Sequence, residues 1–301
     1  MERRRIEVVD STILGTLDEC PRKCQYCFQM GKRTRGEHRA LDFGKAYHAG
    51  TAAWYKSGKN DEEMLKAFNA EYSIYAADAE SQGEDGEDSK EIRTYSKGHE
   101  LLLARSRQFR DEEWEWLGGE QQFVLDLPGC PLRYAGFVDA FGRETKGERQ
   151  YVVQEEKTST SPWIFCSNPN AQITGYVYAA KVLFKEDIRR AYLTMAGIYK
   201  PSVEGRVRGK KKTDPLREVV NREIVDLNLW DLEEWRWEVG EKCYELIRYE
   251  ALKWWPKRTR SCGNYGGCAF QPICQAPPNM REEFLDAGFE ENFWSPLDER
   301  R

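Results

Sequence analysis

Two glutamates and a lysine follow the apolar start of a strand-like run at residues 150–157, QYVVQEEK. Strand side chains alternate between faces, so Glu155 and Lys157 should share one face while Glu156 lies on the other. Asp139 stands in the preceding strand-like run, AGFVDAF. Two carboxylates on adjacent strands suit a hard cation such as Mg²⁺, with a lysine ammonium beside it. This pattern indicates a metal site that could act on phosphates.

The pairing register of the two strands decides whether the carboxylates meet. If Asp139 pairs with Val153 it shares the face of Glu155, but if it pairs with Val152 it does not. The connecting turn, GRETKGER, does not select either register. The alternative without chemistry is a surface hairpin with a cross-strand ion pair, which contributes less than about 1 kcal/mol when exposed.

The nine cysteines form two terminal groups and a scattered set. An odd number does not suit a secreted disulfide framework. The C-terminal group stands at regular intervals in a Gly-rich segment, SCGNYGGCAFQPIC, which suggests metal binding and leaves a fourth ligand to be found. The scattered cysteines are interpreted as buried apolar fillers. The three sets are Cys262, Cys268 and Cys274; Cys20, Cys24 and Cys27; and Cys130, Cys166 and Cys243.

The N-terminal third of the chain should be helical. Ser11 is a plausible helix cap, and Pro21 suits the first turn of a second helix. Further helices are predicted from their periodicity at 41–57, 61–77 and 89–117, with an acidic loop around SQGEDGEDS.

The rest of the chain mixes strands and helices. The strands at 121–127, 132–141 and 150–157 should form an antiparallel meander. A helix at 168–184, strands at 189–199 and 217–227, and a long helix at 231–255 that Pro256 stops should follow. These elements predict one mixed sheet flanked by helices, with cysteine groups just outside both ends.

Composition limits the class of protein. The chain of 301 residues has 40% hydrophobic and 32% charged residues and a net charge of -5. It contains no apolar run of about 18 residues and no signal-peptide core, so we expect a cytoplasmic protein that does not enter a membrane. Any DNA contact must come from local basic patches, and we single out the basic residues of 22–35 and the stretch GRVRGKKKT at 205–213. A solvated loop is the alternative for the second stretch.

The order of these motifs resembles one nuclease family. A helix with GKAYH precedes a strand with G-x-x-D, a strand with E-x-K, and a helix carrying Gln172 and Tyr176 four residues apart. This order is similar to the RecB-type branch of the PD-(D/E)XK nuclease superfamily, which includes CRISPR adaptation nucleases, AddB-type helicase–nuclease domains and phage exonucleases. The resemblance covers about residues 11–274 and implies a restriction-endonuclease-like α/β (α+β) fold.

The resemblance also implies roles for particular residues. It makes His48, Asp139 and Glu155 ligands of Mg²⁺ or Mn²⁺, and Lys157 the catalytic lysine. Gln172 and Tyr176 match a Q-x-x-x-Y helix that supports the active site and DNA, although their spacing alone shows only that they share a helix face. Without this resemblance, His48 would be interpreted as an ordinary core or surface histidine.

The same branch has a [4Fe-4S] group with one cysteine before the fold, in a Cys-Pro pair, and three after it. By this resemblance Cys20, Cys262, Cys268 and Cys274 hold the cluster, although zinc would accept the same four sulfurs. In the commoner form of the family, the first two of the three C-terminal cysteines stand closer together than Cys262 and Cys268 do here. Cys24 and Cys27 are rivals for Cys20, but they fall on one helical stripe with it and are interpreted as core residues.

The expected protein is a single nuclease domain over 1–301. We divide it into an N-terminal cluster segment (1–40), a helical part (41–117), a catalytic core (118–200), a strand and long helix (201–255), and a C-terminal cluster segment with a tail (256–301). The expected activity is that of a metal-dependent DNA exonuclease in recombination, repair or phage DNA processing. Lys210, Lys211 and Lys212 are expected to contact the DNA, and a helicase or recombinase is the expected partner. The alternatives are a nonenzymatic DNA-binding scaffold and a CRISPR-type spacer-processing nuclease.

Overall fold

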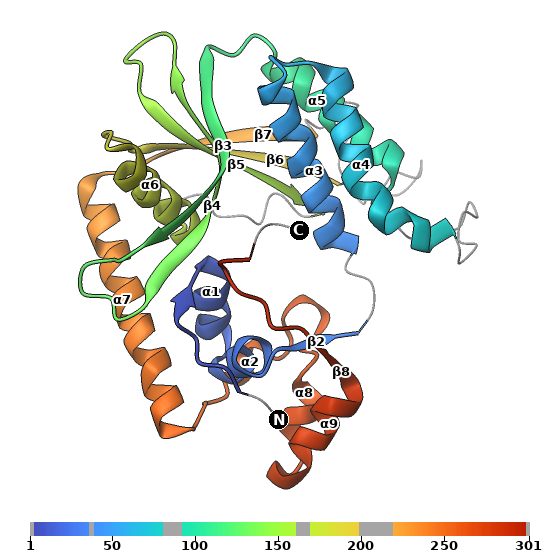
Figure 1. Cartoon of the computed structure of the whole chain (residues 1–301), viewed down its shortest axis with the longest axis vertical. Helices are drawn as coiled ribbons and strands as arrows, with labels where there is room; N and C mark the ends of the chain where they lie inside the picture. The colour runs from blue at the N-terminus through green and yellow to red at the C-terminus, as the bar shows by residue number, and fades with distance from the viewer. Residues whose placement is uncertain (1–2, 36–38, 81–91, 161–168, 199–218, 299–301) are drawn as a thin grey trace, which may run out of the picture.

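A six-stranded mixed sheet lies at the centre of the computed structural model, which describes residues 3–35, 39–80, 92–160, 169–198 and 219–298 (Figure 1). The strands run in the order β1-β4-β5-β6-β7, and β3 pairs with the other side of β4. Their bounds are β1 Val8–Val9, β3 Trp114–Leu125, β4 Arg133–Glu144, β5 Tyr151–Ser159, β6 Arg190–Gly197 and β7 Val220–Asp226. The predicted mixed sheet flanked by helices is confirmed.

The predicted meander is present, and its register has the parity that the candidate site needs. β3, β4 and β5 are consecutive antiparallel strands. Ala140 pairs with Gln154 and Phe141 pairs with Val153. Continued by one residue, this register sets Asp139 opposite Glu155. The two carboxylate-bearing residues therefore share one face of the sheet.

Helices cover both faces of the sheet (Figure 1). The helices α3 Arg39–Lys56, α4 Asp61–Glu80 and α5 Tyr95–Phe109 enclose one hydrophobic core. The helices α1 Ser11–Glu19, α6 Ala171–Phe184 and α7 Leu229–Leu252 enclose the other. Because α6 crosses over between β5 and β6, those two strands are parallel.

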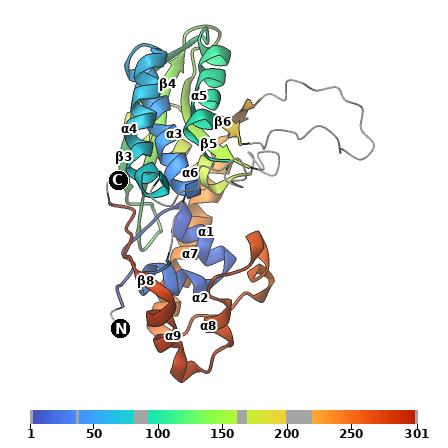
Figure 2. The same ribbon diagram turned by 90° about the vertical axis from the view of Figure 1, so that its right-hand side faces the viewer.

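Two segments near the ends of the chain, 20–34 and 259–291, form a smaller unit below the sheet and lie side by side in both views (Figures 1 and 2). β2 pairs antiparallel with β8, and a third apolar cluster joins Tyr26 and Met30 to Phe270 and Phe289. The elements of this unit are α2 Pro21–Cys24, the π-helical turn Gln25–Gln29, β2 Lys32–Thr34, the 3-10 turns Thr259–Ser261, Asn264–Gly266 and Pro278–Met280, α8 Gln271–Gln275, α9 Arg281–Gly288 and β8 Phe289–Glu291. The subdivision of the chain given above stays a prediction.

Three helix boundaries differ from the prediction. Asp10, not Ser11, caps α1, because its Oδ1 accepts from the Ile13 amide at 2.7 Å. The helix predicted to reach residue 117 ends at Phe109, and β3 begins at Trp114, which packs its indole into the α3 core. The long helix ends at Leu252, where Lys253 adopts a left-handed φ of 52°, so Pro256 does not stop it.

Two of the five basic residues in the predicted patch between residues 22 and 35 are paired with carboxylates. Lys32 is buried and its Nζ lies 2.7 Å from Asp286 Oδ1. Lys23 pairs with Glu19 at 2.8 Å, and Arg22 Nε donates to the Trp255 carbonyl at 3.0 Å. These cations join the N-terminal segment to its neighbours. In the described part of the chain, no helix has the length and apolarity needed to cross a membrane.

Candidate active site

Glu155, in the middle of β5, is the centre of a group of polar side chains. Its side chain is buried, and the Lys157 ammonium contacts its Oε1. The other carboxylate oxygen, Oε2, is buried without a hydrogen-bond partner among the described residues. A buried carboxylate oxygen without a partner carries a free-energy cost, so this oxygen is ready to accept a proton or a cation.

Burial raises the pKa of Glu155 to about 7. The neighbouring Asp139 carboxylate raises it further, while the Lys157 ammonium and His48 act in the opposite direction. Two neighbouring carboxylates at a buried position hold negative charge poorly without a cation. The electrostatics of the pair therefore favour binding of positive charge.

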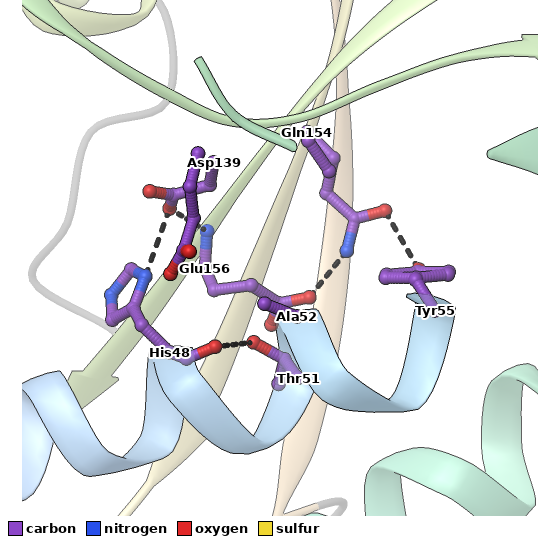
Figure 3. A pocket seen from close by; sticks show the side chains of 9 residues that line it. His48, Thr51, Ala52, Tyr55, Asp139, Gln154 and Glu156 are labelled. Carbon is purple, nitrogen blue, oxygen red and sulfur yellow. Dashed lines mark hydrogen bonds and ion pairs between the residues drawn. The ribbon is translucent and has the colours of Figure 1, made fainter. Parts of the chain in front are cut away.

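Asp139 lies on β4 and contacts both β5 and helix α3. Its Oδ2 accepts from the backbone amide of Glu156 at 3.1 Å and lies 3.1 Å from Nδ1 of His48 (Figure 3). His48 comes from the middle of α3, where Thr51 Oγ1 donates to its carbonyl oxygen at 2.9 Å. A small cleft of about 10 Å³ between α3 and the sheet is lined by these residues, which is room for about one water molecule. The structure thus brings together His48 and Asp139 as predicted.

The predicted pair on α6 also reaches the site. Gln172 Nε2 lies 2.9 Å from Tyr176 Oη and 3.5 Å from Glu155 Oε1. Asn170 caps α6 by accepting from the amides of Gln172 and Ile173, both at 3.1 Å, which places Gln172 in the first turn beside β5.

Gly136 explains how α6 can lie so close to the sheet. A Cβ at this position would lie 2.8 Å from the Phe123 ring and 3.4 Å from the Tyr176 ring. The space beside Gly136 is therefore filled by aromatic rings.

Sequence reasoning missed the network behind Glu155. Glu156 lies on the opposite face, fully buried, and forms an ion pair with Arg105 of α5. Arg105 Nε donates to Glu156 Oε1 at 2.9 Å, and Arg105 Nη2 donates to Tyr55 Oη at 2.8 Å. Gln154 also donates to Glu156 (Figure 3). The alternation of the strand indicated the face of Glu156, but its partner lies 51 residues away in sequence.

This network continues to the sheet edge at β7. Tyr55 Oη lies 3.0 Å from both Glu112 Oε1 and Gln154 Oε1. Arg222 of β7 donates to Glu112 at 2.6 Å and to Thr194 at 2.9 Å. Arg105 thus compensates the buried Glu156, Arg222 compensates the partly buried Glu112, and these bonds connect β5 to α5 and β7 behind the candidate site.

The predicted cluster cysteines gather where the two ends of the chain meet. Cys20 is buried at the start of α2, and the Arg258 amide lies 3.5 Å from its sulfur. Burial raises the pKa of Cys274, and the nearby Cys20 and Cys268 raise it further. Cys262 joins this segment through its carbonyl oxygen, which accepts from the Cys268 amide at 2.8 Å.

The two rival cysteines have different surroundings. Cys24 is fully buried in the main core, as predicted. Cys27 is half-buried, packs against the third apolar cluster and interacts electrostatically with Cys268, so it lies nearer the trailing cysteines than a core residue would. The eight described cysteines are all free thiols.

No three His, Cys, Asp or Glu side chains in the described ranges are already arranged as a metal-binding group. Lys210, Lys211, Lys212 and Cys166 lie outside the described residues.

A mixed sheet with an antiparallel meander, a crossover helix and an Asp, Glu-x-Lys group at its centre is consistent with a restriction-endonuclease-like fold. The chain belongs to the PD-(D/E)XK nuclease superfamily, because the model of that family matches residues 11–275. A search of curated proteins finds no match.

Two solved structures show weaker similarity. One is a protein of Eubacterium rectale described as a candidate exonuclease, with 11% identity, a TM-score of 0.44 and coverage of 85% of this chain and 86% of that chain. The other is the protein SSO0001, with 13% identity, a TM-score of 0.27 and coverage of 71% of this chain and 78% of that chain.

Proposed function

We propose that this protein is a metal-dependent deoxyribonuclease that removes nucleotides from DNA ends. The observation that carries the proposal is the buried Glu155 carboxylate, with one oxygen on Lys157 and the other without a partner in the described chain, next to Asp139. Membership of a nuclease superfamily supports phosphodiester hydrolysis as the reaction. The restriction to DNA ends goes beyond that membership and is tested below.

The residues at this site fit a hard divalent cation. Glu155 offers a buried oxygen without a partner, Asp139 offers a second carboxylate, and His48 offers a ring nitrogen 3.1 Å from Asp139. Mg²⁺ takes few protein oxygens and otherwise keeps waters or substrate phosphates, and Mn²⁺ also accepts imidazole. When bound, the metal would lower the pKa of a water and offset charge on the phosphate.

The protein's own groups would orient and stabilise the substrate. Lys157 is partly exposed and stands at the end of β5, so its ammonium can leave Glu155 and bind a phosphate oxygen or position the attacking water. Gln172 and Tyr176 would hold Glu155 in place from α6, and the Arg105–Glu156 pair would hold β5 from behind. A rigid strand reduces the reorganisation needed at the moment of reaction.

We further propose that Cys20, Cys262, Cys268 and Cys274 hold a [4Fe-4S] cluster. The pairing of β2 with β8 brings both ends of the chain together, and the thiols of Cys20, Cys268 and Cys274 interact there. Four thiolates are the usual ligand set of such a cluster. Its role would be structural, because it closes a loop of more than two hundred residues far from Glu155 in sequence. The proposed setting is DNA recombination, repair or phage DNA processing, with a helicase or recombinase as partner.

End-labelled DNA tests the proposed function. The protein, purified without oxygen, is incubated with single- and double-stranded DNA labelled at the 5′ or the 3′ end, with Mg²⁺, Mn²⁺ or a chelator. Release of labelled mononucleotides or short products from one end, only with metal, is expected. Cleavage of a closed circular DNA at a similar rate would contradict the exonuclease assignment, and DNA binding without any cleavage would make the protein a scaffold.

A further inference from the structure

Cys130 and Cys243 are far apart in sequence but meet in the structure. Cys130 stands in the turn between β3 and β4, and Cys243 lies on the buried face of α7. The Cys130 and Cys243 side chains interact directly, and this interaction is the largest cause of the pKa shift of each. The Cys130 thiol also donates to the Leu132 carbonyl oxygen at 3.0 Å. Both cysteines pack in the main apolar core, Cys243 fully buried and Cys130 half-buried, as expected for apolar fillers, but they also interact with each other.

The backbone holds the two thiols together. The turn rests directly on α7: a Cβ on Gly240 would lie 3.4 Å from the carbonyl oxygen of Gly129. Arg236, one turn earlier on α7, donates to the Pro128 carbonyl. Gly240 is three residues before Cys243, so the close approach of turn and helix sets Cys130 beside the next turn of α7. The contact is thus built into the packing of the hairpin on the helix.

We propose that Cys130 and Cys243 form a reversible disulfide when the protein meets a peroxide oxidant. Cys130 is half-buried and can be reached from solvent, whereas Cys243 is fully buried and serves as the resolving thiol. The Cys130 thiolate attacks one peroxide oxygen, the O–O bond breaks, and a sulfenic acid forms with release of hydroxide. The Cys243 sulfur then attacks the Cys130 sulfur, the S–O bond breaks, and the oxygen leaves as water. Two thiols and one hydrogen peroxide give one disulfide and two waters.

The electrostatics of the pair agree with this order. The interaction with Cys243 lowers the pKa of Cys130 to about 7. The same interaction, together with burial, raises the pKa of Cys243. Near neutral pH Cys130 is therefore the sulfur with thiolate character, and it is also the one that an oxidant can reach.

The disulfide would tie the start of β4 to the middle of α7. The closed loop exceeds one hundred residues, so the bond restricts the unfolded chain strongly. It lies apart from the terminal cysteines and does not depend on the proposed nuclease activity.

Peptide mapping tests the thiol pair directly. Fully reduced protein is treated with a small excess of hydrogen peroxide, free thiols are alkylated, and the chain is digested with trypsin. The peptides 111–133 and 243–248 each contain one cysteine. We expect a cross-linked species two hydrogens lighter than the sum of both peptides, which dithiothreitol converts back. Cys130 found as a thiol, as a sulfinic acid, or linked to another cysteine would overturn the proposal.

Two variants complete the test. In Cys130→Ser, peptide 243–248 should keep a free thiol after peroxide, and oxidation of Cys243 in this variant would contradict the assigned order. The reduced native protein should gain about 5 °C in Tm on oxidation relative to Cys130→Ser treated alike. Cys243→Ala is the second variant, and if it folds, its Cys130 should oxidise to the sulfinic acid. An equal Tm change in native protein and Cys130→Ser would show that this disulfide does not form.

Discussion

Glu155 and Glu156 are neighbours in β5, but their carboxylates lie on opposite faces of the sheet. Glu155 contacts Lys157 on the face of α6, and Glu156 is ion-paired with Arg105 on the face of α5. Each glutamate has one carboxylate oxygen without a hydrogen-bond partner among the described residues, but Glu155 lies beside a partly exposed lysine, whereas Glu156 is ion-paired with the fully buried Arg105. Two adjacent carboxylates therefore have different expected roles, and their variants should separate activity from stability.

Substitution of the candidate catalytic residues should remove activity and keep the fold. Glu155→Gln keeps the shape but removes the charge that a cation needs, and Lys157→Ala removes the ammonium beside it. Each should lower the DNA cleavage rate by about 100-fold or more, since groups that stabilise charge in a transition state have effects of this size. Asp139→Asn should behave in the same way. The measurement is the rate on end-labelled DNA at saturating Mg²⁺.

A thermal melt accompanies each of these variants. Gln121→Ala, on an exposed position of β3, is the matched control and should keep both the rate and the melt. Unchanged cleavage by folded Glu155→Gln would remove the assignment of the active site.

Breaking the ion pair behind the site should destabilise the protein. Arg105→Met leaves the buried Glu156 carboxylate without its cation, which should lower the free energy of unfolding by about 3–5 kcal/mol. The double variant Arg105→Met, Glu156→Met replaces both charges by apolar side chains and should recover most of that loss. Urea unfolding curves of the two variants and the native protein measure the difference. A double variant no more stable than Arg105→Met would show that the pair is not coupled.

The cap of α1 should make stability depend on pH. Burial raises the pKa of Asp10 from 3.8 to about 6, so the native state keeps a proton that the unfolded chain has already lost. The free energy of unfolding should therefore fall as pH rises from about 4 to about 6, by roughly 2–3 kcal/mol from this group. Asp10→Asn keeps the capping oxygen and should remove this slope, which makes the variant more stable than the native protein at pH 7.

Denaturant titrations at several pH values test this effect. Asp10→Ala serves as the comparison, because it also removes the charge but loses the cap to Ile13 and about 1 kcal/mol with it. A native protein and an Asp10→Asn variant with the same pH slope would contradict the raised pKa of Asp10.

The cluster proposal predicts a coloured, iron-containing protein. Anaerobically purified protein should contain about four iron and four sulfide per chain. Cys20→Ser, Cys268→Ser and Cys274→Ser should lose the iron and melt earlier, because the two ends of the chain are no longer joined. Cys24→Ser and Cys27→Ser should keep it. A protein that contains one zinc and no sulfide would indicate a zinc site in place of the cluster. Loss of iron from Cys27→Ser but not from Cys20→Ser would indicate that Cys27 is the fourth ligand.

The basic stretch 205–213 should contribute to DNA affinity and leave the chemistry unchanged. Replacement of Lys210, Lys211 and Lys212 by Ala should weaken binding and reduce the slope of log affinity against log salt by up to about 3. The cleavage rate at saturating DNA should not change. Binding by fluorescence anisotropy over a range of salt concentrations measures the slope, and an unaltered slope would indicate a solvated loop.

Local patterns in the sequence were enough for the types of the main elements and for the choice of the candidate site residues. Strand alternation determined that Glu155 and Lys157 share a face, and the order of helices and strands pointed to the superfamily. Such signals depend on neighbouring residues only, so they can be read without the fold. The same local view placed the end of a helix at residue 117, because it could not show that Trp114 packs into the α3 core as part of a strand.

The tertiary structure decided which distant residues meet. The β4–β5 register sets Asp139 opposite Glu155, which the turn sequence left open. Arg105 reaches Glu156, Cys130 reaches Cys243, and β2 reaches β8 only because helices pack on both faces of the sheet and the chain ends return to one place. These contacts depend on the packing of elements that are remote in sequence, and no periodicity within a single element records them.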